Sequence, residues 1–335
     1  MVDIEYLDKP QDTDGLLEML CPPVRNWFKD KFPDFTRPQK LAIPAIMDRK
    51  HLLLCSPTGS GKTLTAFLTI IDKLVRLALD KKLEKKVHCV YISPIKALAN
   101  DIQRNLIGPL TEISEKYLPD RAQEIKVGLR TGDTPQSERQ KMLKKPPHIL
   151  ITTPESLAIA ITSPRFQPIV SELEYMIVDE LHSLVPSKRG VHLSLTLSYL
   201  DTLLKTPVQR IGISATMEPL EQVAEYLVSS DDLETRGKQS KVSIAKVSGS
   251  RELDLDIILP DNRFSDLSVM KVLEKNIEII ADLIAAHNTT LVFANTRKMT
   301  ETLVQRLRPH LGDLVAGHHG SMDKKIRLDV EKKLK

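Results

Sequence analysis

Aromatic residues, cysteines and long apolar runs are all scarce in this sequence, and each shortage excludes something. Phe, Trp and Tyr make up 4% of the 335 residues, so stacking of nucleic-acid bases on aromatic side chains is not expected to dominate any contact. The three cysteines, Cys21, Cys55 and Cys89, lie far apart without a CxxC pair, which argues against a zinc site or a disulfide framework. No apolar run of about 18 residues occurs, so no membrane span is predicted. The acidic start, MVDIEYLDKP, lacks the apolar segment of a signal peptide, and we expect a cytoplasmic protein.

Net charge is also small. The 48 Lys and Arg residues exceed the 44 Asp and Glu residues by only four. This balance permits a polyanionic partner without predicting one. The length of 335 residues is enough for two domains, each with its own core.

Short apolar segments alternate with longer segments of helical periodicity. A helix is expected over 64–79, where apolar residues recur at helical spacing. The expected strands are 51–56, 87–93, 124–129, 148–153, 174–179 and 209–214. Near-continuous apolar strands separated by helices predict an α/β fold in which a parallel sheet is covered on both faces.

A second α/β domain is expected after a polar, charged segment at 229–241, which reads as a linker. We therefore predict one domain over 1–235 and the beginning of another over 236–335. In the second, strands are expected at 242–247, 253–259 and 290–294, and helices at 269–286 and near 299–307.

A glycine-rich segment joins the first of these strands to the following helix. Its residues are Ser56, Pro57, Thr58, Gly59, Ser60, Gly61, Lys62 and Thr63. Glycines let backbone N–H groups turn toward a phosphate, and the helix N-terminus favours negative charge. Lys62 can then reach the outer phosphates of a nucleotide, while the Thr63 hydroxyl can ligate Mg²⁺. The first glycine of the usual pattern is replaced by Ser56, and a Gly/Ser turn with a solvated lysine is the alternative interpretation.

Two carboxylates, Asp179 and Glu180, follow the apolar strand 174–179. A carboxylate at a strand tip beside a phosphate loop can hold Mg²⁺, and its neighbour can orient or deprotonate a water molecule. Taken alone, such a pair is more often a solvated strand end or helix cap. His182 could relay between a nucleotide and a second site, or be an ordinary histidine satisfied by its neighbours.

These segments, in this order, resemble motifs of superfamily 2 helicases. The matching segments are RPQ (37–39), SPTGSGKT (56–63), SPIKALAND (93–101), RTGDT (130–134), ITTPESL (151–157), VDELH (178–182), ISAT (213–216), VFANTR (292–297) and GHHGS (317–321). The amino-acid sequences of these motifs, together with KRGVHLSL (188–195), are especially similar to those of the Lhr (large helicase-related) family. The resemblance runs from about residue 16 to the end.

The resemblance implies an ATP-dependent enzyme with two RecA-like, P-loop NTPase domains that moves 3′ to 5′ on single-stranded DNA or an RNA/DNA hybrid. It implies that Gln39 reads the adenine and that the loop 56–63 binds the phosphates, with Lys62 acting in catalysis. Thr63 and Asp179 would hold Mg²⁺, and Glu180 would activate water. The residues that couple hydrolysis to strand movement would be His182, Ser214 and Thr216. A hydroxyl-capped strand end is the other interpretation of the last two.

The segments expected to grip nucleic acid share a physical feature. In SPIK and TTPE, a Ser or Thr before Pro follows an apolar strand, which predicts a helix cap with free backbone N–H groups ready for a phosphate. Plain helix capping is the alternative at any single site. Such contacts read the backbone, so little sequence specificity is expected. The candidate residues are Pro94, Lys96, Thr131, Gly132, Thr153, Pro154, Glu155, Asn295, Thr296, Arg297, His319 and Gly320.

The helicase pattern stops before its arginine-bearing motif, and Arg327 does not match that motif. We therefore expect an incomplete second domain, weak ATP binding and slow hydrolysis by this chain alone, with the C-terminal remainder of the helicase needed for a complete site. The competing interpretation is a truncated binding module without turnover. A P-loop ATPase of another class is disfavoured by the TTPE and SAT segments.

Overall fold

The structure is a computed structural model that describes residues 2–94, 102–118, 122–215, 217–228, 241–247, 254–260 and 268–334. The chain divides into two compact units, Met1–Ser250 and Arg251–Lys335. Each unit is described below by itself.

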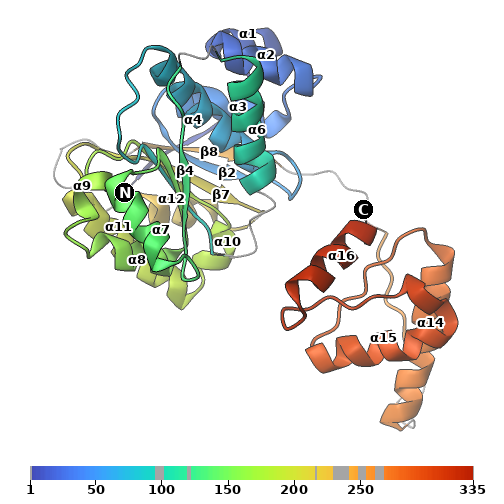
Figure 1. Cartoon of the computed structure of the whole chain (residues 1–335). Helices are drawn as coiled ribbons and strands as arrows, with labels where there is room; N and C mark the ends of the chain where they lie inside the picture. The colour runs from blue at the N-terminus through green and yellow to red at the C-terminus, as the bar shows by residue number, and fades with distance from the viewer. Residues whose placement is uncertain are drawn as a thin grey trace. The chain divides into compact units, whose positions relative to one another are not determined.

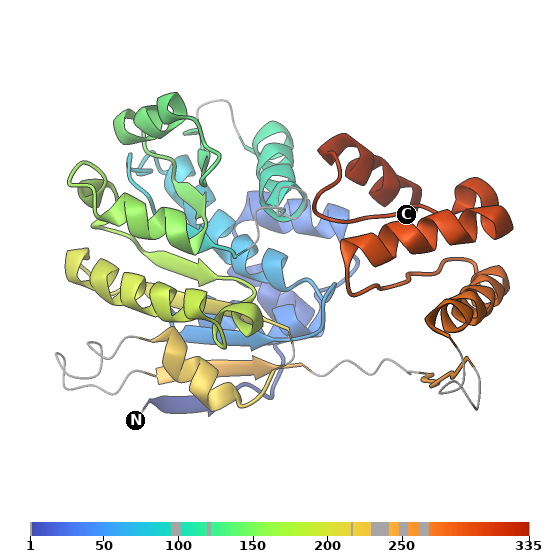
Figure 2. The same ribbon diagram turned by 90° about the horizontal axis from the view of Figure 1, so that it is seen from below.

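The first unit is built on an eight-stranded sheet in which all paired strands are parallel, in the order β1-β8-β2-β7-β6-β3-β5-β4 (Figure 1). Figure 2 shows the dark-blue β1 beside the tan β8 at one end of this sheet. The strands are β1 (Asp3–Tyr6), β2 (His51–Cys55), β3 (Cys89–Ile92), β4 (Val127–Arg130), β5 (Ile149–Thr152), β6 (Tyr175–Val178), β7 (Gln209–Ser214) and β8 (Lys241–Lys246).

Helices cover both faces of the sheet because successive strand residues enter two separate cores. In β2, Leu52 and Leu54 belong to one core, whereas Leu53 and Cys55 belong to the other. The first core is shared with η1 (Gln103–Ile107) and with α1 (Thr13–Met19), α2 (Pro22–Lys31), α3 (Arg37–Met47), α4 (Lys62–Leu79) and α6 (Gly108–Lys116). The second is shared with α8 (Pro154–Ile161), α9 (Gln167–Val170), α10 (Leu181–Leu184), α11 (Lys188–Leu203) and α12 (Leu220–Leu227). The predicted parallel α/β fold is confirmed.

Two strands at one end of the sheet correct the sequence prediction. β1 was not predicted, because DIEY is short and mixes polar with apolar residues. β8, expected in the second domain, pairs with β1 and β2 and so completes the first sheet. The boundary predicted at 235/236 is therefore wrong and lies after Ser250. A polar segment marks a loop but does not tell whether the chain returns to the same sheet; most of the proposed linker, 229–240, lies outside the described residues.

The second unit contains α14 (Val269–Ala286), α15 (Arg297–Leu311), η3 (Gly312–Leu314) and α16 (Lys324–Leu334). Its buried core is formed by Ile277, Ala281 and Leu307. Helices α14 and α15 were predicted, but the strands expected at 253–259 and 290–294 are absent from the described residues of those segments. A strand needs a hydrogen-bonded neighbouring strand, and segment 290–294 has none among the described residues. Its Phe293 side chain is accordingly 91% exposed. No helix in the described part of the chain is long and apolar enough to span a bilayer.

Candidate nucleotide and strand site

The sequence motifs of the first unit gather along one edge of its sheet. In a parallel sheet all carboxyl ends lie at the same edge, where ligands of open α/β sheets bind. β2, β7 and β6 are adjacent strands. The residues at or just after their carboxyl ends, 56–63, 214–215 and 179–182, form what we call the phosphate-loop half. The next strands in the sheet are β3, β5 and β4. The residues that follow them, 93–94, 153–156 and 131–134, form what we call the capped half.

The phosphate loop takes a conformation that requires its glycines. Gly59 and Gly61 have φ values of 80° and 88°, in the left-handed region that residues with a Cβ rarely adopt. Gly61 is the N-cap of α4, so the loop delivers the first backbone N–H groups of that helix to the edge. The Ser56 and Ser60 hydroxyl groups lie 2.7 Å apart, which joins the first residue of the loop to the residue before Gly61.

Lys62 folds back across this loop. Its Nζ donates to the carbonyl oxygens of Ser56 (2.6 Å) and Pro57 (2.7 Å). Partial burial lowers the pKa of the Lys62 ammonium, and the negative charges of Asp179 and Glu180 act against this effect. The ammonium of Lys62 therefore interacts electrostatically with both carboxylates that follow β6.

Asp179 is nearly buried, with 4% of its surface exposed. Its carboxylate accepts from the Tyr91 hydroxyl and, at 2.8 Å, from the Glu180 backbone N–H. Burial nevertheless raises the pKa of Asp179 to about 6, and the Glu180 charge adds to this rise, while the two hydrogen bonds and Lys62 oppose it. The carboxylate thus carries a negative charge at neutral pH that the protein compensates only in part.

Glu180 has φ 54°, an uncommon conformation for a residue with a side chain, at the N-cap of α10. Its carboxylate oxygen lies 3.1 Å from Nε2 of His182. The Ala215 backbone N–H donates to Nδ1 of the same ring at 3.2 Å, so Nδ1 is the acceptor and Nε2 carries the hydrogen toward Glu180. The Ser214 hydroxyl lies 3.5 Å from Nδ1. One imidazole therefore links the ends of β6 and β7; Thr216 lies outside the described residues.

Gln39 stands beside the phosphate loop. Its Oε1 accepts from the Thr36 backbone N–H at 2.8 Å in a capping box at the start of α3. A Cβ added to Gly61 would lie 3.3 Å from Nε2 of Gln39, so the amide nitrogen faces the loop. The predicted adenine-reading residue is thus adjacent to the loop, with its carbonyl already used within the helix cap.

A metal ion at this edge would have few protein ligands. Among the described residues, no group of three or more His, Cys, Asp or Glu side chains is arranged to hold one. Mg²⁺ commonly uses one or two protein oxygens and completes its shell with phosphate oxygens and water. The single buried Asp179 carboxylate and the Thr63 hydroxyl, at the start of α4, fit that donor set.

The capped half is built from hydroxyl groups and prolines. Thr153 is the N-cap of α8; it accepts from the Ser156 backbone N–H at 3.4 Å, and Pro154 occupies the first helical position. The cap predicted at TTPE is confirmed. At the end of β3, Pro94 is described, whereas Lys96 and the helix expected after it lie outside the described residues.

The turn at 131–134 is held by its own threonine and by an arginine. The Thr134 hydroxyl accepts from the Thr131 backbone N–H at 2.9 Å. Arg139 donates to the carbonyl oxygens of Thr131, Gly132 and Thr134 at 2.9–3.1 Å. The sequence prediction missed Arg139, whose only signal was its place in the polar helix α7 (Gln136–Lys144) directly after the RTGDT segment.

Comparison with known proteins agrees with this geometry. The family model "DEAD/DEAH box helicase" matches residues 36–224, which span both halves of the edge. The chain belongs to the DEAD/DEAH box helicase family. It is 45% identical over 334 residues to the "ATP-dependent helicase Lhr-Core" of Methanocaldococcus jannaschii, covering 99% of this chain and 38% of that protein. It is 37% identical to the "Lhr helicase/uracil glycosylase" of Escherichia coli, covering 90% of this chain and 20% of that protein.

Among solved structures, the helicase Lhr of Mycobacterium smegmatis, bound to single-stranded DNA and AMP-PNP, matches with a TM-score of 0.76 and 38% identity. That match covers 95% of this chain and 40% of the other. The predicted resemblance to the Lhr family is confirmed, and this helicase-family chain spans less than half the length of these relatives.

In the second unit, the helicase-like segments VFANTR and GHHGS lie at mostly exposed positions, although the His319 side chain is only 13% exposed. Thr296 is the N-cap of α15 and accepts from the Met299 backbone N–H at 3.1 Å, so Arg297 is the first residue of that helix and Asn295 precedes the cap. His319, next to Gly320, places its Nε2 3.2 Å from a Glu301 carboxylate oxygen.

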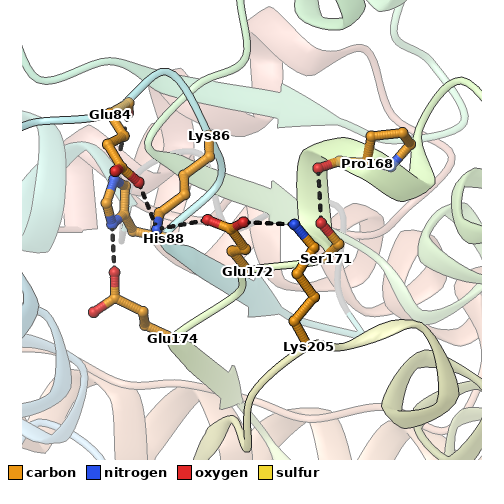
Figure 3. Close-up of polar contacts among 8 residues, drawn as sticks. All are labelled: Glu84, Lys86, His88, Pro168, Ser171, Glu172, Glu174 and Lys205. Carbon is orange, nitrogen blue, oxygen red and sulfur yellow. Dashed lines mark hydrogen bonds and ion pairs between the residues drawn. The ribbon is translucent and has the colours of Figure 1, made fainter.

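The opposite edge of the sheet carries charges that the helicase motifs do not use. There, a hollow of about 590 Å³ lies before the first residues of β3 and β6. Figure 3 shows Lys86 and Lys205 directed at the Glu172 carboxylate, at 3.3 and 2.7 Å, and His88 directed at Glu174, at 2.7 Å. Because each of these side chains is paired with another of the cluster, we interpret it as a structural network that joins three loops.

Proposed function

We propose that this protein is an ATP-dependent helicase or translocase that couples ATP hydrolysis to movement along a single strand of DNA or of an RNA/DNA hybrid. The observation that carries the proposal is the shared edge: a phosphate loop and a buried carboxylate on one half, and a threonine-capped helix start beside a hydroxyl-held turn on the other. The single-stranded DNA and the ATP analogue bound by the M. smegmatis relative support the same assignment.

In this proposal, the glycine loop and Lys62 bind the phosphates of ATP. Lys62 releases the Ser56 and Pro57 carbonyl oxygens, to which it now donates, and turns its ammonium to the phosphates. Gln39 lies next to the loop, where the adenine would be read. Thr63 and Asp179 would hold Mg²⁺, which when bound neutralises charge on the phosphate oxygens.

Glu180 is placed to orient the attacking water and accept its proton. The His182 Nε2–H, 3.1 Å from the Glu180 carboxylate, fixes the direction of that side chain. Since the other ring nitrogen accepts from Ala215, a shift of the β7 end would move the histidine and hence the carboxylate. His182, with Ser214 and Thr216, would thereby couple movement of the nucleic-acid strand to ATP hydrolysis.

The nucleic-acid backbone would lie over the capped half, contacted by Pro94, Lys96, Thr131, Gly132, Thr153 and Pro154. From the second unit, the proposed contacts are Asn295, Thr296, Arg297, His319 and Gly320. Backbone N–H groups and hydroxyl groups bind phosphates and carry little sequence information, so weak base preference is expected. Glu155 was also predicted as a contact, but its carboxylate is paired with Arg189 at 2.6 Å, which favours an indirect role.

The chain covers 38% of the length of its M. jannaschii relative. We propose that the part of the helicase corresponding to the remainder supplies the missing elements of the ATPase site, including the arginine expected to stabilise the transition state.

The test is steady-state ATP hydrolysis by this chain and by a longer polypeptide that continues it, each with and without a single-stranded oligonucleotide. Strand-stimulated turnover is expected only from the longer polypeptide, and Glu180→Gln should abolish it while ATP binding persists. Glu115→Gln, at an exposed position on α6, is the matched control and should leave turnover unchanged. Turnover indifferent to the strand, or retained in Glu180→Gln, would contradict the proposal, and strand binding without any turnover would favour a binding module.

A further inference from the structure

Arg189 is a side chain of α11 that reaches two loops of the capped half at once. Its Nε and Nη2 atoms donate to the two carboxylate oxygens of Glu155 at 2.6 and 3.2 Å, and Nη2 also donates to the Pro94 carbonyl oxygen at 3.0 Å. Pro94 follows β3 and Glu155 begins α8 after β5, and these two strands are neighbours in the sheet. A planar guanidinium with donors at fixed angles suits such a bridge, whereas a lysine ammonium could not reproduce it.

The base of this bridge is rigid because the first turn of α11 is fixed to α10. A Cβ added to Gly190 would lie 2.1 Å from the Leu184 carbonyl oxygen, so only glycine allows this approach. The Tyr226 hydroxyl, from α12, donates to the Gly190 carbonyl oxygen at 2.7 Å. Since α10 begins directly after Glu180, a short, braced path leads from the catalytic carboxylate to the bridge.

We propose that Arg189 is a positioning residue that sets the spacing of the loops after β3 and β5, and so controls how tightly the capped half holds a nucleic-acid backbone. This inference rests on the proposed strand-binding function. Arg189 acts through Glu155 and Pro94: the carboxylate neutralises the guanidinium, and both Nε and Nη2 are already directed at protein oxygens.

A direct phosphate contact by Arg189 is the competing role, and the two roles predict opposite results for Glu155→Gln. If the bridge matters, Glu155→Gln breaks it and weakens strand binding despite the loss of a negative charge. If Arg189 contacts phosphate itself, the same change frees the guanidinium and tightens binding. The sign of the effect therefore separates them.

The first experiment measures binding of a fluorescent single-stranded oligonucleotide and of a fluorescent ATP analogue by the 335-residue chain. Arg189→Gln is expected to weaken strand binding about 10-fold, which corresponds to one good charge-assisted bridge. Arg189→Lys should not restore binding, and Glu155→Gln combined with Arg189→Gln should be no weaker than Arg189→Gln alone. Affinity for the ATP analogue should be unchanged. Arg165→Gln, which removes the same charge from an exposed position beyond the far end of α8, is the control.

The second experiment does not depend on strand binding. Amide hydrogen exchange over residues 153–157 should accelerate in Arg189→Gln but not in Arg165→Gln, because the bridge holds the first turn of α8. Unchanged exchange, tighter binding by Glu155→Gln, or full function of Arg189→Lys would each overturn the positioning role. If exchange accelerates while no variant, nor the natural chain, binds a strand, the positioning role holds and the proposed function fails.

Discussion

Along one edge of the first sheet, the phosphate-loop half gathers charged side chains around a buried carboxylate, whereas the capped half is built from hydroxyl groups, prolines and backbone amides and has its ion pair in solvent. The first half holds Asp179 at 4% exposure beside a partly buried lysine. In the capped half, the Glu155 side chain is 49% exposed, and its partner Arg189 on α11 is 46% exposed. The two halves meet at the neighbouring parallel strands β6 and β3. Both therefore rest on the same sheet, and they differ in the side chains that they carry.

The difference follows from what each half is proposed to bind. A compact triphosphate can be enclosed, and removing its partners from water strengthens every charge interaction with it. A continuous strand must enter and leave, so its site stays open and uses many weak contacts to phosphates. Changes in the phosphate-loop half should therefore have large effects on one ligand, and changes in the capped half should have small effects on the other.

The largest expected effect is that of Lys62→Ala. Affinity for a fluorescent ATP analogue should fall at least about 100-fold, because the only ammonium described inside the loop is lost. The affinity of Lys62→Ala for a single-stranded oligonucleotide without nucleotide should stay within about 2-fold of that of the natural chain. The reason is that Lys62 does not contact the capped half in the described residues. Lys82→Ala, whose side chain is 72% exposed, is the matched control. Equal losses for both ligands would break the distinction between the halves.

Asp179 should make stability depend on pH. Its pKa is raised from 3.8 to about 6 in the folded protein, so the natural chain loses stability as the pH rises from about 4 to about 6. The difference corresponds to about 3 kcal/mol. Without nucleotide or Mg²⁺, Asp179→Asn should therefore be more stable than the natural chain at pH 7.5 and nearly equal to it at pH 4.

Urea unfolding at the two pH values measures this difference. Asp48→Asn, at the exposed C-cap of α3, is the matched control for the same change of side chain. A constant difference between Asp179→Asn and the natural chain across this range would mean that the phosphate-loop half does not confine an uncompensated charge.

Coupling between binding of an ATP analogue and binding of a single-stranded oligonucleotide should be reduced by His182→Ala. Binding of an ATP analogue and of a strand influence each other by one reciprocal factor, and the His182 ring is the described link between the ends of β6 and β7. We expect the factor by which the ATP analogue changes strand affinity to shrink about 10-fold, within the usual size of such couplings. His192→Ala, at an exposed position of α11, is the control. An unchanged factor would assign coupling to other residues.

Much of this edge could be predicted because its signals are local. Seven of the eight strands coincide with expected apolar segments, since a strand buried on both faces must be apolar along its length. The edge strand β1 escapes that rule. β8 was placed in the wrong domain because the sequence of one strand does not show which other strands it pairs with. The strands expected at 253–259 and 290–294 had the composition of strands but lack partners in the described chain.

The site shows the same limit at the level of side chains. Lys62, Asp179 and Glu180 could be predicted because loop and strand-end chemistry is encoded by neighbours in sequence. The braces could not: Arg189 reaches Pro94 across 95 positions, and Tyr91 reaches Asp179 across 88. Such contacts depend on strand order, which places β3 next to both β6 and β5.

The smallest expected effect tests whether the capped half is more than a set of helix caps. Thr153→Ala removes the N-cap hydroxyl of α8 and should lower the free energy of unfolding by about 1 kcal/mol. Thr162→Ala, at the C-cap of the same helix, is the matched control, since its hydroxyl only donates to the Ile159 carbonyl oxygen. If the caps also orient amides toward phosphates, Thr153→Ala should weaken strand binding about 3-fold beyond the control, an amount typical of one lost neutral hydrogen bond. Equal strand affinities for the two variants, at unequal stabilities, would show that capping alone explains Thr153 and would move the strand away from the start of α8.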